Sequence, residues 1–364
     1  MRYIILLSLS LFFLFDTANA DHLKKLSNEK AFQFHQFRMQ KIPQLYKTIS
    51  IKPSVAPTEL VREARIDPAV EKMLKETDLI SVMRFQDGKI LIDAMSKKMK
   101  PDDKMYSMSM MKSLIGYLVG HAVCDGHIKN LKDPVSRYLP EVKGTIYERV
   151  PIDQMINMAA GDQPIWKGKY NIQEYSALVL LAKPDERKTI LEVLKSKPNK
   201  KPKGTGSFRY SNLVTDLIGV VLDKTVPGGL EAYMHHKLAS PAGNADPMML
   251  LVDKNDWPIS HAFLYATRDD YMRMSIQIMN DFQADNCIGD YLRGQTKNYV
   301  KTSNGSEGYA AFFWLEDVSS PTPRLLMKGH GGQRIIIDIK DGTITTMHAI
   351  RLNYDMKKLE KLLR

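Results

Sequence analysis

A serine and a lysine three residues apart, Ser109 and Lys112, stand at the start of an apolar stretch. On a helix these positions share one face, so the two side chains can touch. A serine hydroxyl becomes a nucleophile when a neighbouring base removes its proton, and a lysine partly withdrawn from water can be that base. The N–H groups at the start of a helix also favour an oxyanion. The pair therefore predicts nucleophilic attack on a carbonyl carbon.

The same spacing occurs in a polar stretch at Ser27 and Lys30. Spacing alone therefore does not distinguish a nucleophile from a serine that caps a helix. Two further segments of the sequence strengthen the assignment of Ser109.

The first of these segments is a turn-rich loop that enters a helix and contains Tyr210 and Asn212. We expect Tyr210 to exchange a proton with the Ser109–Lys112 pair, and Asn212 to offer its amide to a substrate carbonyl. The alternative is that Tyr210 packs in the core and that Ser211 or Asn212 caps the helix.

The second segment begins at Lys328, where a strand pattern runs into His330, Gly331 and Gly332. Glycines let a backbone approach a ligand closely. A free strand edge here would present the main-chain N–H of Gln333 as a second oxyanion donor, beside the N–H of the serine. The alternative is a tight turn between two strands.

The sequence lacks the common motifs of metal-dependent and nucleotide-dependent enzymes. It has no Gly-x-x-x-x-Gly-Lys-Ser/Thr loop, no His-Glu-x-x-His and no Gly-x-Ser-x-Gly elbow. His235 and His236 are adjacent, so on a helix they point apart and make a poor metal pair. We therefore expect no metal site.

The candidate residues need secondary structure to position them. Apolar residues at 111, 114, 115, 118, 119, 122 and 123 have helical spacing, which predicts a mostly buried helix over 110–123, starting beside Ser109. Two apolar, β-branched runs around Asp87 and Gly88 predict a β-hairpin over 78–93.

The rest of the chain shows helical patterns in its middle and strand patterns near its end. The predicted helices cover 151–158, 174–182, 187–195, 211–223, 229–238, 267–281 and 354–364. The predicted strands cover 309–315, 324–328, 334–339 and 343–350. This order predicts an α/β fold of the α+β type: an antiparallel sheet formed by both termini and flanked by helices, plus a mostly helical domain.

The first twenty residues have the pattern of a targeting signal rather than of a folded element. Arg2 precedes an apolar run over 3–15, and Ala18-Asn19-Ala20 follows. This is typical of a secretory signal peptide, and it predicts a periplasmic or secreted protein. The alternative is an uncleaved anchor. No other apolar stretch is long enough to cross a bilayer, so we expect no membrane span after cleavage.

Export implies an oxidising compartment, in which Cys124 and Cys287 could form a disulfide. Their separation in the sequence leaves the pairing open. The alternative is a buried free thiol at Cys124, because that cysteine lies on an apolar helix.

The charge pattern argues against a role in binding an anionic polymer such as a nucleic acid. The 52 Lys and Arg residues exceed the 41 Asp and Glu residues, which gives a formal net charge of +11. The lysines are scattered and form no array with aromatic residues. We therefore interpret the excess as solvated surface charge and expect no nucleic-acid binding.

Taken together and in this order, the three segments resemble the motifs of serine hydrolases related to class C β-lactamases and penicillin-binding proteins. That family carries Ser-x-x-Lys, then Tyr-x-Asn, then Lys-Thr-Gly or His-x-Gly. The matching residues here are Ser109 and Lys112, Tyr210 and Asn212, and His330 and Gly332. Flanking blocks and the final strands are similar too, so the resemblance runs from about residue 78 to residue 350. The Gly-His-Gly-Gly-Gln end is most similar to the branch that contains 6-aminohexanoate-oligomer hydrolases and esterases.

The resemblance implies a sheet domain over 21–100 and 262–364, a helical domain over 101–261, and an active site between them. It also implies acyl transfer without metal or organic cofactor, on a small ester, amide or peptide. In this mechanism Ser109 forms the acyl-enzyme, and Lys112 and Tyr210 relay its proton.

The sequence departs from the family pattern in the third motif, where His330 replaces the lysine that helps to hold a substrate carboxylate. A histidine is mostly neutral at pH 7, whereas Lys328 lies two residues earlier on the same strand face and is a candidate to compensate. Trp166 and Tyr170 are candidate pocket walls, with packing in the core as the alternative. Two other functions stay open: a β-lactamase or D-alanyl-D-alanine carboxypeptidase, and a non-catalytic protein that binds cell-wall peptides. The natural substrate and the oligomeric state are not predicted.

Overall fold

The structure is a computed structural model. It describes residues 42–65, 67–161, 187–196, 205–302, 306–351 and 354–363, together with residues 27, 30, 33, 39 and 179. The predicted signal peptide, the candidate wall residues Trp166 and Tyr170, and all but one residue of the helix predicted at 174–182 lie outside this range. In the part of the chain described, no helix has the length and apolar character needed to cross a membrane.

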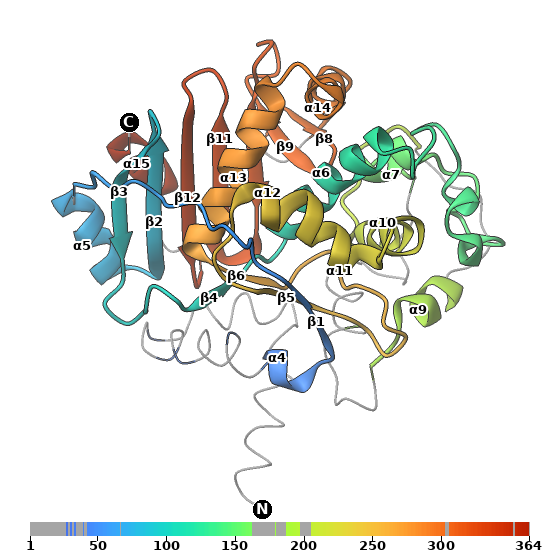
Figure 1. The fold of residues 1–364 in the computed structure, drawn as a ribbon, viewed down its shortest axis with the longest axis horizontal. Coiled ribbons are helices and arrows are strands. Elements are labelled where there is room, and N and C mark those ends of the chain that lie inside the picture. Colours follow the sequence, from blue (N-terminus) through green and yellow to red (C-terminus); the bar gives the residue numbers. More distant parts are fainter. Residues whose placement is uncertain are drawn as a thin grey trace, which may run out of the picture.

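Within the described residues, one antiparallel sheet of eight strands forms the centre of the molecule (Figure 1). In sheet order its strands are β3 (Lys89–Met95), β2 (Leu79–Gln86), β12 (Thr343–Ala349), β11 (Arg334–Asp338), β10 (Arg324–Lys328), β9 (Phe313–Glu316), β8 (Gly308–Ala310) and β7 (Val300–Lys301). Early strand β2 pairs with late strand β12, with Val82 opposite Met347. The prediction of a sheet built from both ends of the chain is confirmed.

The turns of this sheet follow from local backbone chemistry. The predicted hairpin is confirmed: Asp87 and Gly88 both have positive φ, +49° and +79°, as a two-residue hairpin turn requires. The predicted strand over 309–315 is corrected to two strands, β8 and β9. Ala311 and Phe312 have positive φ, +46° and +62°, so the backbone turns sharply between them.

Helices cover both faces of the large sheet, as Figure 1 shows. Helix α13 (Arg268–Gln283) packs against β2, β11 and β12. On the opposite face, α5 (Pro68–Glu76) and α15 (Met356–Leu362) share a separate apolar cluster with the sheet. Apolar side chains are therefore buried on both sides of the sheet.

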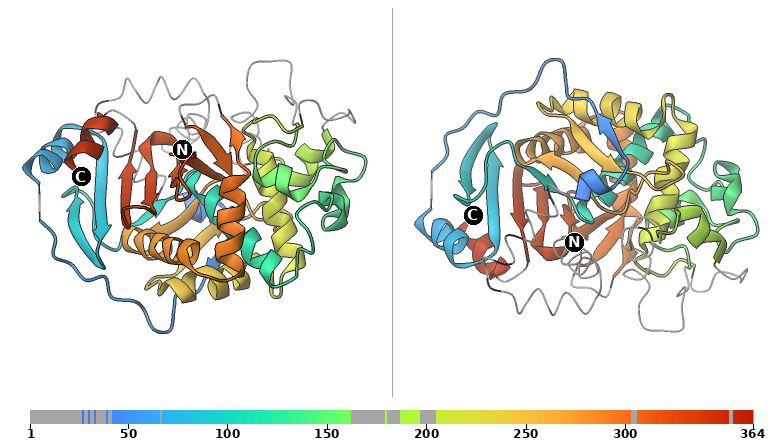
Figure 2. Two further views of the ribbon diagram at one scale, coloured as in Figure 1. Left: turned by 90° about the horizontal axis from the view of Figure 1, so that it is seen from above. Right: turned by 90° about the horizontal axis from the view of Figure 1, so that it is seen from below.

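A second, smaller antiparallel sheet was not predicted. It contains, in order, β1 (Thr48–Ile51), β5 (Met248–Leu251), β6 (Leu264–Thr267) and β4 (Lys104–Tyr106). Strands of three or four residues are too short to show a clear alternation of apolar and polar residues. From β1 the chain runs along the outside of the molecule to α5 (Figure 2), held by hydrogen bonds from Ser54 to Asn244 and from Thr58 to Gly243, both 2.9 Å long.

The remaining helices and short helical turns lie mostly in the middle of the chain. In chain order they are α4 (Ile42–Leu45), α6 (Met110–Cys124), η1 (Val135–Arg137), η2 (Pro140–Val142), α7 (Ile152–Ile156), α9 (Ile190–Ser196), α10 (Asn212–Thr225), α11 (Gly229–Met234), the π-helical turn η4 (His235–Ala239), α12 (Ser240–Ala242), α14 (Cys287–Lys297) and the turn η5 (His330–Gly332). Nearly every residue of α6 is buried, as predicted. Helix α14 was not predicted.

The corner between β8 and β9 docks onto two of these helices. The main-chain N–H of Phe312 donates to the Ile156 carbonyl at 2.8 Å, and the Phe312 carbonyl accepts from Ser113 at 2.8 Å. A side-chain carbon at Gly116 would lie 1.8 Å from the Ala311 carbonyl oxygen, so only glycine fits there. These contacts fix α6 and α7 against the edge of the sheet.

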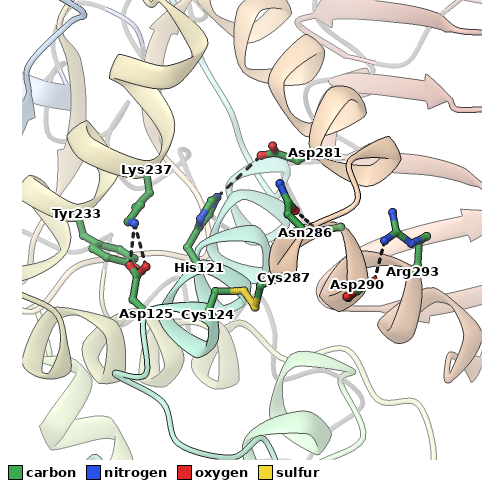
Figure 3. The surroundings of a disulfide bond; sticks show 11 residues. His121, Cys124, Asp125, Tyr233, Lys237, Asp281, Asn286, Cys287, Asp290 and Arg293 are labelled. Atoms are coloured by element: carbon green, nitrogen blue, oxygen red, sulfur yellow. Dashed lines mark hydrogen bonds and ion pairs between the residues drawn. A yellow bond between two sulfur atoms is a disulfide. The ribbon is translucent and has the colours of Figure 1, made fainter.

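A disulfide joins the last residue of α6 to the first residue of α14 (Figure 3). The bond links Cys124 to Cys287, whose Cα atoms are 5.8 Å apart. Next to it, the Asp125 carboxylate accepts from Tyr233 at 2.7 Å and pairs with Lys237 at 2.8 Å. The pairing that the sequence left open is therefore present, and the free-thiol alternative is wrong.

Candidate active site

Ser109 and Lys112 meet at the start of α6. Ser109 is the N-cap residue, and Lys112 lies in the first turn of the helix. The Lys112 Nζ atom donates to the Ser109 hydroxyl oxygen at 3.0 Å. Ser109 is partly exposed, whereas the Lys112 side chain is only 1% exposed. The structure therefore brings together the nucleophile and the base that the sequence predicted.

Burial changes the acid–base behaviour of Lys112. Loss of water around the ammonium group lowers the pKa of Lys112 to about 7, and the nearby Asp216 carboxylate opposes part of this shift. At neutral pH a large fraction of the lysine is consequently unprotonated. Such an amine can accept the proton of the serine hydroxyl as Ser109 attacks a carbonyl.

Tyr210 is the third member of the site. Its hydroxyl shares a hydrogen bond with Ser109, and the Lys112 Nζ atom lies 5.0 Å from the centre of its ring. Burial raises the pKa of Tyr210 well above its ordinary value, and the bond with Ser109 opposes this only in part. The phenol consequently stays protonated near neutral pH, which suits a group that passes a proton onward.

The loop that carries Tyr210 is held by the residues that follow α7. The N–H of Arg209 donates to the Met158 carbonyl at 2.6 Å, and the N–H of Gly206 donates to the Ala159 carbonyl at 2.8 Å. Two residues beyond Tyr210, α10 begins at the buried Asn212. The N-cap residue is Ser211, and its side chain makes no capping hydrogen bond.

Three aromatic rings pack around Tyr210. The Trp314 ring stacks on Tyr210 with centroids 5.6 Å apart, and the Phe208 ring lies 5.6 Å from Trp314. Tyr309 completes this aromatic cluster at 6.2 Å from Tyr210. Phe208, Tyr210 and Trp314 are each partly exposed, so the cluster offers apolar surface beside Ser109.

The glycine segment after β10 lies next to the start of α6. A side-chain carbon at Gly329 would be 2.8 Å from the Ser107 carbonyl oxygen, so the two backbones are in close contact. Gly331 and Gly332 have φ of +80° and +94° and form the turn η5, while His330 is exposed. The tight turn between two strands, which was the alternative interpretation of this segment, is therefore present, and it lies beside the predicted site.

The side chain of Gln333 is bonded to the end of β12. Its amide group donates to the Ala349 carbonyl and accepts from the Ala349 N–H, and its own carbonyl accepts from Gly329 at 2.9 Å. None of these contacts involves Ser109, so the role of the Gln333 main-chain N–H as an oxyanion donor stays a prediction. The same holds for substrate binding by Asn212, His330, Gly331 and Gly332.

Lys328, the candidate to replace the missing lysine of the third motif, already has partners. Its Nζ atom donates to the Ser306 hydroxyl and lies 3.7 Å from a Glu316 carboxylate oxygen and 5.5 Å from the centre of the Trp314 ring. Burial lowers the pKa of Lys328. Its charge is thus partly balanced before any substrate arrives.

Sequence reasoning missed three residues near the site. Asp216 contacts His261, the main-chain carbonyl of His261 accepts a hydrogen bond from Lys112, and the Trp314 ring stacks on Tyr210. An acidic residue within the apolar pattern of 211–223 was a usable signal for Asp216. His261 and Trp314 are brought in by the tertiary fold, and their sequence neighbourhoods gave no signal.

The serine at a helix start, the buried lysine and the phenol lie together, as the sequence analysis predicted for a serine hydrolase. A family model described as "Beta-lactamase" matches residues 69–356. The chain belongs to the β-lactamase family of serine hydrolases. The resemblance drawn from the three motifs is confirmed.

Individual relatives agree with this assignment. Over 91 residues the chain is 31% identical to the 6-aminohexanoate-dimer hydrolase of Paenarthrobacter ureafaciens, a match of 25% of this chain and only 23% of that protein. A structure described as a 6-aminohexanoate-dimer hydrolase from Bacillus anthracis aligns with a TM-score of 0.76 at 14% identity, over 91% of this chain and 92% of that one. A class C β-lactamase in complex with cefoxitin aligns with a TM-score of 0.59 at 16% identity, over 81% and 94% of the two chains. At these identities the structural likeness establishes the β-lactamase/transpeptidase-like fold.

Proposed function

We propose that this protein is an exported enzyme that hydrolyses an ester or amide bond through an acyl-enzyme on Ser109. The observation that carries the proposal is the 3.0 Å contact between Ser109 and a buried Lys112 whose pKa is about 7. In this proposal the site lies between the sheet part of the chain, 21–100 with 262–364, and the helical part, 101–261.

The reaction proceeds in two halves. Neutral Lys112 takes the proton of Ser109 as its oxygen bonds to the substrate carbonyl carbon, and the main-chain N–H groups of Ser109 and Gln333 bind the resulting oxyanion. Tyr210 then delivers a proton to the leaving amine or alcohol and is reprotonated from Lys112. Water, deprotonated by the same pair, cleaves the acyl-enzyme and releases the acid.

The surroundings of the site favour a neutral ester or amide over a β-lactam. Recognition of a β-lactam carboxylate calls for an available cation, and Lys328 is engaged by Ser306 and Glu316. His330 is exposed, and a histidine is mostly uncharged at pH 7. One relative is named for the hydrolysis of an amide, the 6-aminohexanoate dimer, and another is named a β-lactamase.

A β-lactamase or D-alanyl-D-alanine carboxypeptidase is the second candidate, favoured by the fold shared with a class C β-lactamase bound to cefoxitin. It predicts rapid turnover of nitrocefin, or labelled penicillin trapped on Ser109. The third candidate, a non-catalytic protein that binds cell-wall peptides, predicts that a fluorophosphonate probe leaves Ser109 unlabelled.

Two observations support export. The first twenty residues have the signal-peptide pattern, and the described part of the chain holds a disulfide, a bond typical of oxidising compartments. A mature protein that begins at Asp21 and fractionates with the periplasm or the medium is the expected result. A cytoplasmic protein that keeps its first residue would contradict this part of the proposal.

The decisive experiment compares two serines with the same spacing to a lysine. We expect Ser109→Ala to abolish hydrolysis of p-nitrophenyl acetate, and mass spectrometry to show an acyl adduct on wild-type Ser109. Ser27→Ala is the matched control, because Ser27 is exposed and belongs to the second Ser-x-x-Lys match. Full activity in Ser109→Ala would refute the assignment.

A further inference from the structure

We propose that Asp216 is a positioning residue that holds Lys112 in place through His261. The inference rests on the proposed function, because it concerns the base of that reaction. It adds two residues that no motif of the sequence identified.

Asp216 contacts His261 with both of its carboxylate oxygens. One oxygen accepts from the main-chain N–H of His261 at 2.7 Å, and the other contacts the ring Nδ1 atom at 2.8 Å. Asp216 is 0% exposed and His261 is 2% exposed, so water does not compete for these bonds. A two-point grip of this kind fixes both the backbone and the ring of one residue.

The residue held in this way is the one that contacts Lys112. The main-chain carbonyl of His261 accepts from Lys112 Nζ at 2.6 Å, while the same Nζ donates to Ser109 at 3.0 Å. The lysine head is therefore held between His261 on one side and Ser109 on the other. Any movement of the His261 carbonyl would shift the amine relative to the serine hydroxyl.

The segment around His261 is anchored on both sides, but at other residues. Before it, the N–H of Ile259 donates to the Leu251 carbonyl at 2.9 Å, and after it Leu264 exchanges two hydrogen bonds with Ser107. Phe263 has a φ of +63°, a strained conformation for an aromatic residue. The two bonds from Asp216 to His261 thus hold the middle of this segment, between these two anchored ends.

The charge of Asp216 acts on Lys112 as well. Within the described residues, the Tyr210 ring from the loop before α10 and the Asp216 carboxylate from α10 act on Lys112, and the main-chain carbonyl of His261 contacts it. Burial lowers the pKa of Lys112, and the Asp216 carboxylate raises it part of the way back, to about 7. Without that negative charge the amine would be a weaker base.

The test is Asp216→Asn, which keeps the shape of the side chain and removes its charge. We expect kcat to fall about tenfold with KM nearly unchanged, and the Lys112 titration to move to lower pH. The titration is followed by NMR of protein with ¹⁵N-labelled lysine side chains, with the Lys112 signal assigned by its loss in Lys112→Met. An Asp216→Asn protein with the wild-type kcat would overturn the positioning role, and one with the wild-type titration midpoint would overturn the effect of the Asp216 charge on Lys112.

A matched control is Asp270→Asn. Asp270 is equally buried, and its carboxylate bonds to the N–H groups of Ala245 and Asp246 and to Arg273. This variant should lose stability and keep the Lys112 midpoint, because a merely structural role does not alter the field at Lys112. A midpoint that moves equally in both variants counts against the proposal.

A second variant, His261→Gln, tests the positioning role even when Asp216→Asn does not fold. His261→Gln keeps the carboxylate and loses the ring contact, so we expect kcat to fall while the Lys112 midpoint stays near that of the wild type. Wild-type kcat in His261→Gln would overturn the role of His261. The NMR titration needs no turnover, so absence of Ser109-dependent hydrolysis would refute the proposed function while the titration still judges the role of Asp216.

Discussion

The two sides of Ser109 are built differently. On one side, Lys112, Asp216 and His261 are almost completely buried and joined by hydrogen bonds of 2.6–3.0 Å. On the other side, the partly exposed rings of Tyr210 and Trp314 contact each other through their faces. We call Lys112, Asp216 and His261 the lysine side, which is held by polar contacts. We call Tyr210 and Trp314 the aromatic side, which presents apolar surface.

This difference separates two tasks within the proposed reaction. A buried polar group that loses its hydrogen-bond partner is left without either that partner or water, which costs the full free energy of desolvation. Substitutions on the lysine side should therefore be poorly tolerated. Rings that contact one another through dispersion lose energy gradually when one is reduced in size. We expect the lysine side, together with the Tyr210 hydroxyl, to set the rate of the chemistry, and the ring faces of the aromatic side to set which acyl groups bind.

The largest expected effect comes from exchanging a lysine on each side for methionine. Lys112→Met should lower kcat for p-nitrophenyl ester hydrolysis roughly 10³-fold, because it removes the base. Lys328→Met, on the aromatic side, should change kcat less than about tenfold, since Lys328 contacts Trp314 and Glu316 rather than Ser109. Equal losses in both variants would remove the distinction between the two sides.

The pH dependence of hydrolysis sharpens the comparison. In the proposed mechanism the neutral form of Lys112 is the active one, so kcat/KM should rise with pH through about 7 and then level off. At pH 5 about 1% of a group with this pKa is neutral, so activity should be roughly 100-fold below the plateau. Since burial raises the pKa of Tyr210, the plateau should extend into the alkaline range. A rate that is constant from pH 5 to pH 8 would show that Lys112 is not the base.

A smaller effect is expected from the aromatic side alone. Trp314→Ala removes the ring that stacks on Tyr210 and should raise KM roughly tenfold for esters with bulky acyl groups. Acetyl esters, which reach less of this surface, should be affected less, and a series of acyl lengths measures the difference. A uniform loss of kcat across the series would instead mean that Trp314 only holds Tyr210 in place.

The smallest effect on turnover is expected at the far end of α6. Replacing Cys124 and Cys287 by serine opens a link between residues 163 apart in the sequence and should lower the free energy of unfolding by about 2–4 kcal/mol. Because the disulfide lies in the last turn of α6, at the end opposite Ser109, kcat should stay within about twofold of the wild type. Urea unfolding and ester hydrolysis on one preparation separate the two quantities, and a large loss of kcat would mean that the disulfide holds the catalytic end of the helix.

The sequence was informative where local chemistry dictates structure. Helical spacing predicted α6, the Asp87-Gly88 pair predicted its hairpin, and the Ser-x-x-Lys spacing predicted the contact of Ser109 with Lys112. The small sheet and α14 escaped prediction because their patterns are short or weakly periodic.

The surroundings of the site were less predictable. His261 lies 149 residues from Lys112, and Trp314 about a hundred residues from Tyr210, so only the complete fold brings them together. The Cys124–Cys287 bond was left open for the same reason. Two cysteines show that a bond can form, whereas the packing of α6 against α14 determines that it does.

The place of β12 between β2 and β11 has a consequence for biosynthesis. Until the ribosome has made residues 343–349, the β2–β3 hairpin and the strands from β7 to β11 have nothing to join them into one sheet. A growing chain therefore carries Ser109 and Lys112 for more than two hundred residues of translation before the sheet beside them can close. Such long-range pairing makes folding slow and late, so truncation just before β12 should yield an aggregation-prone polypeptide rather than a smaller working enzyme.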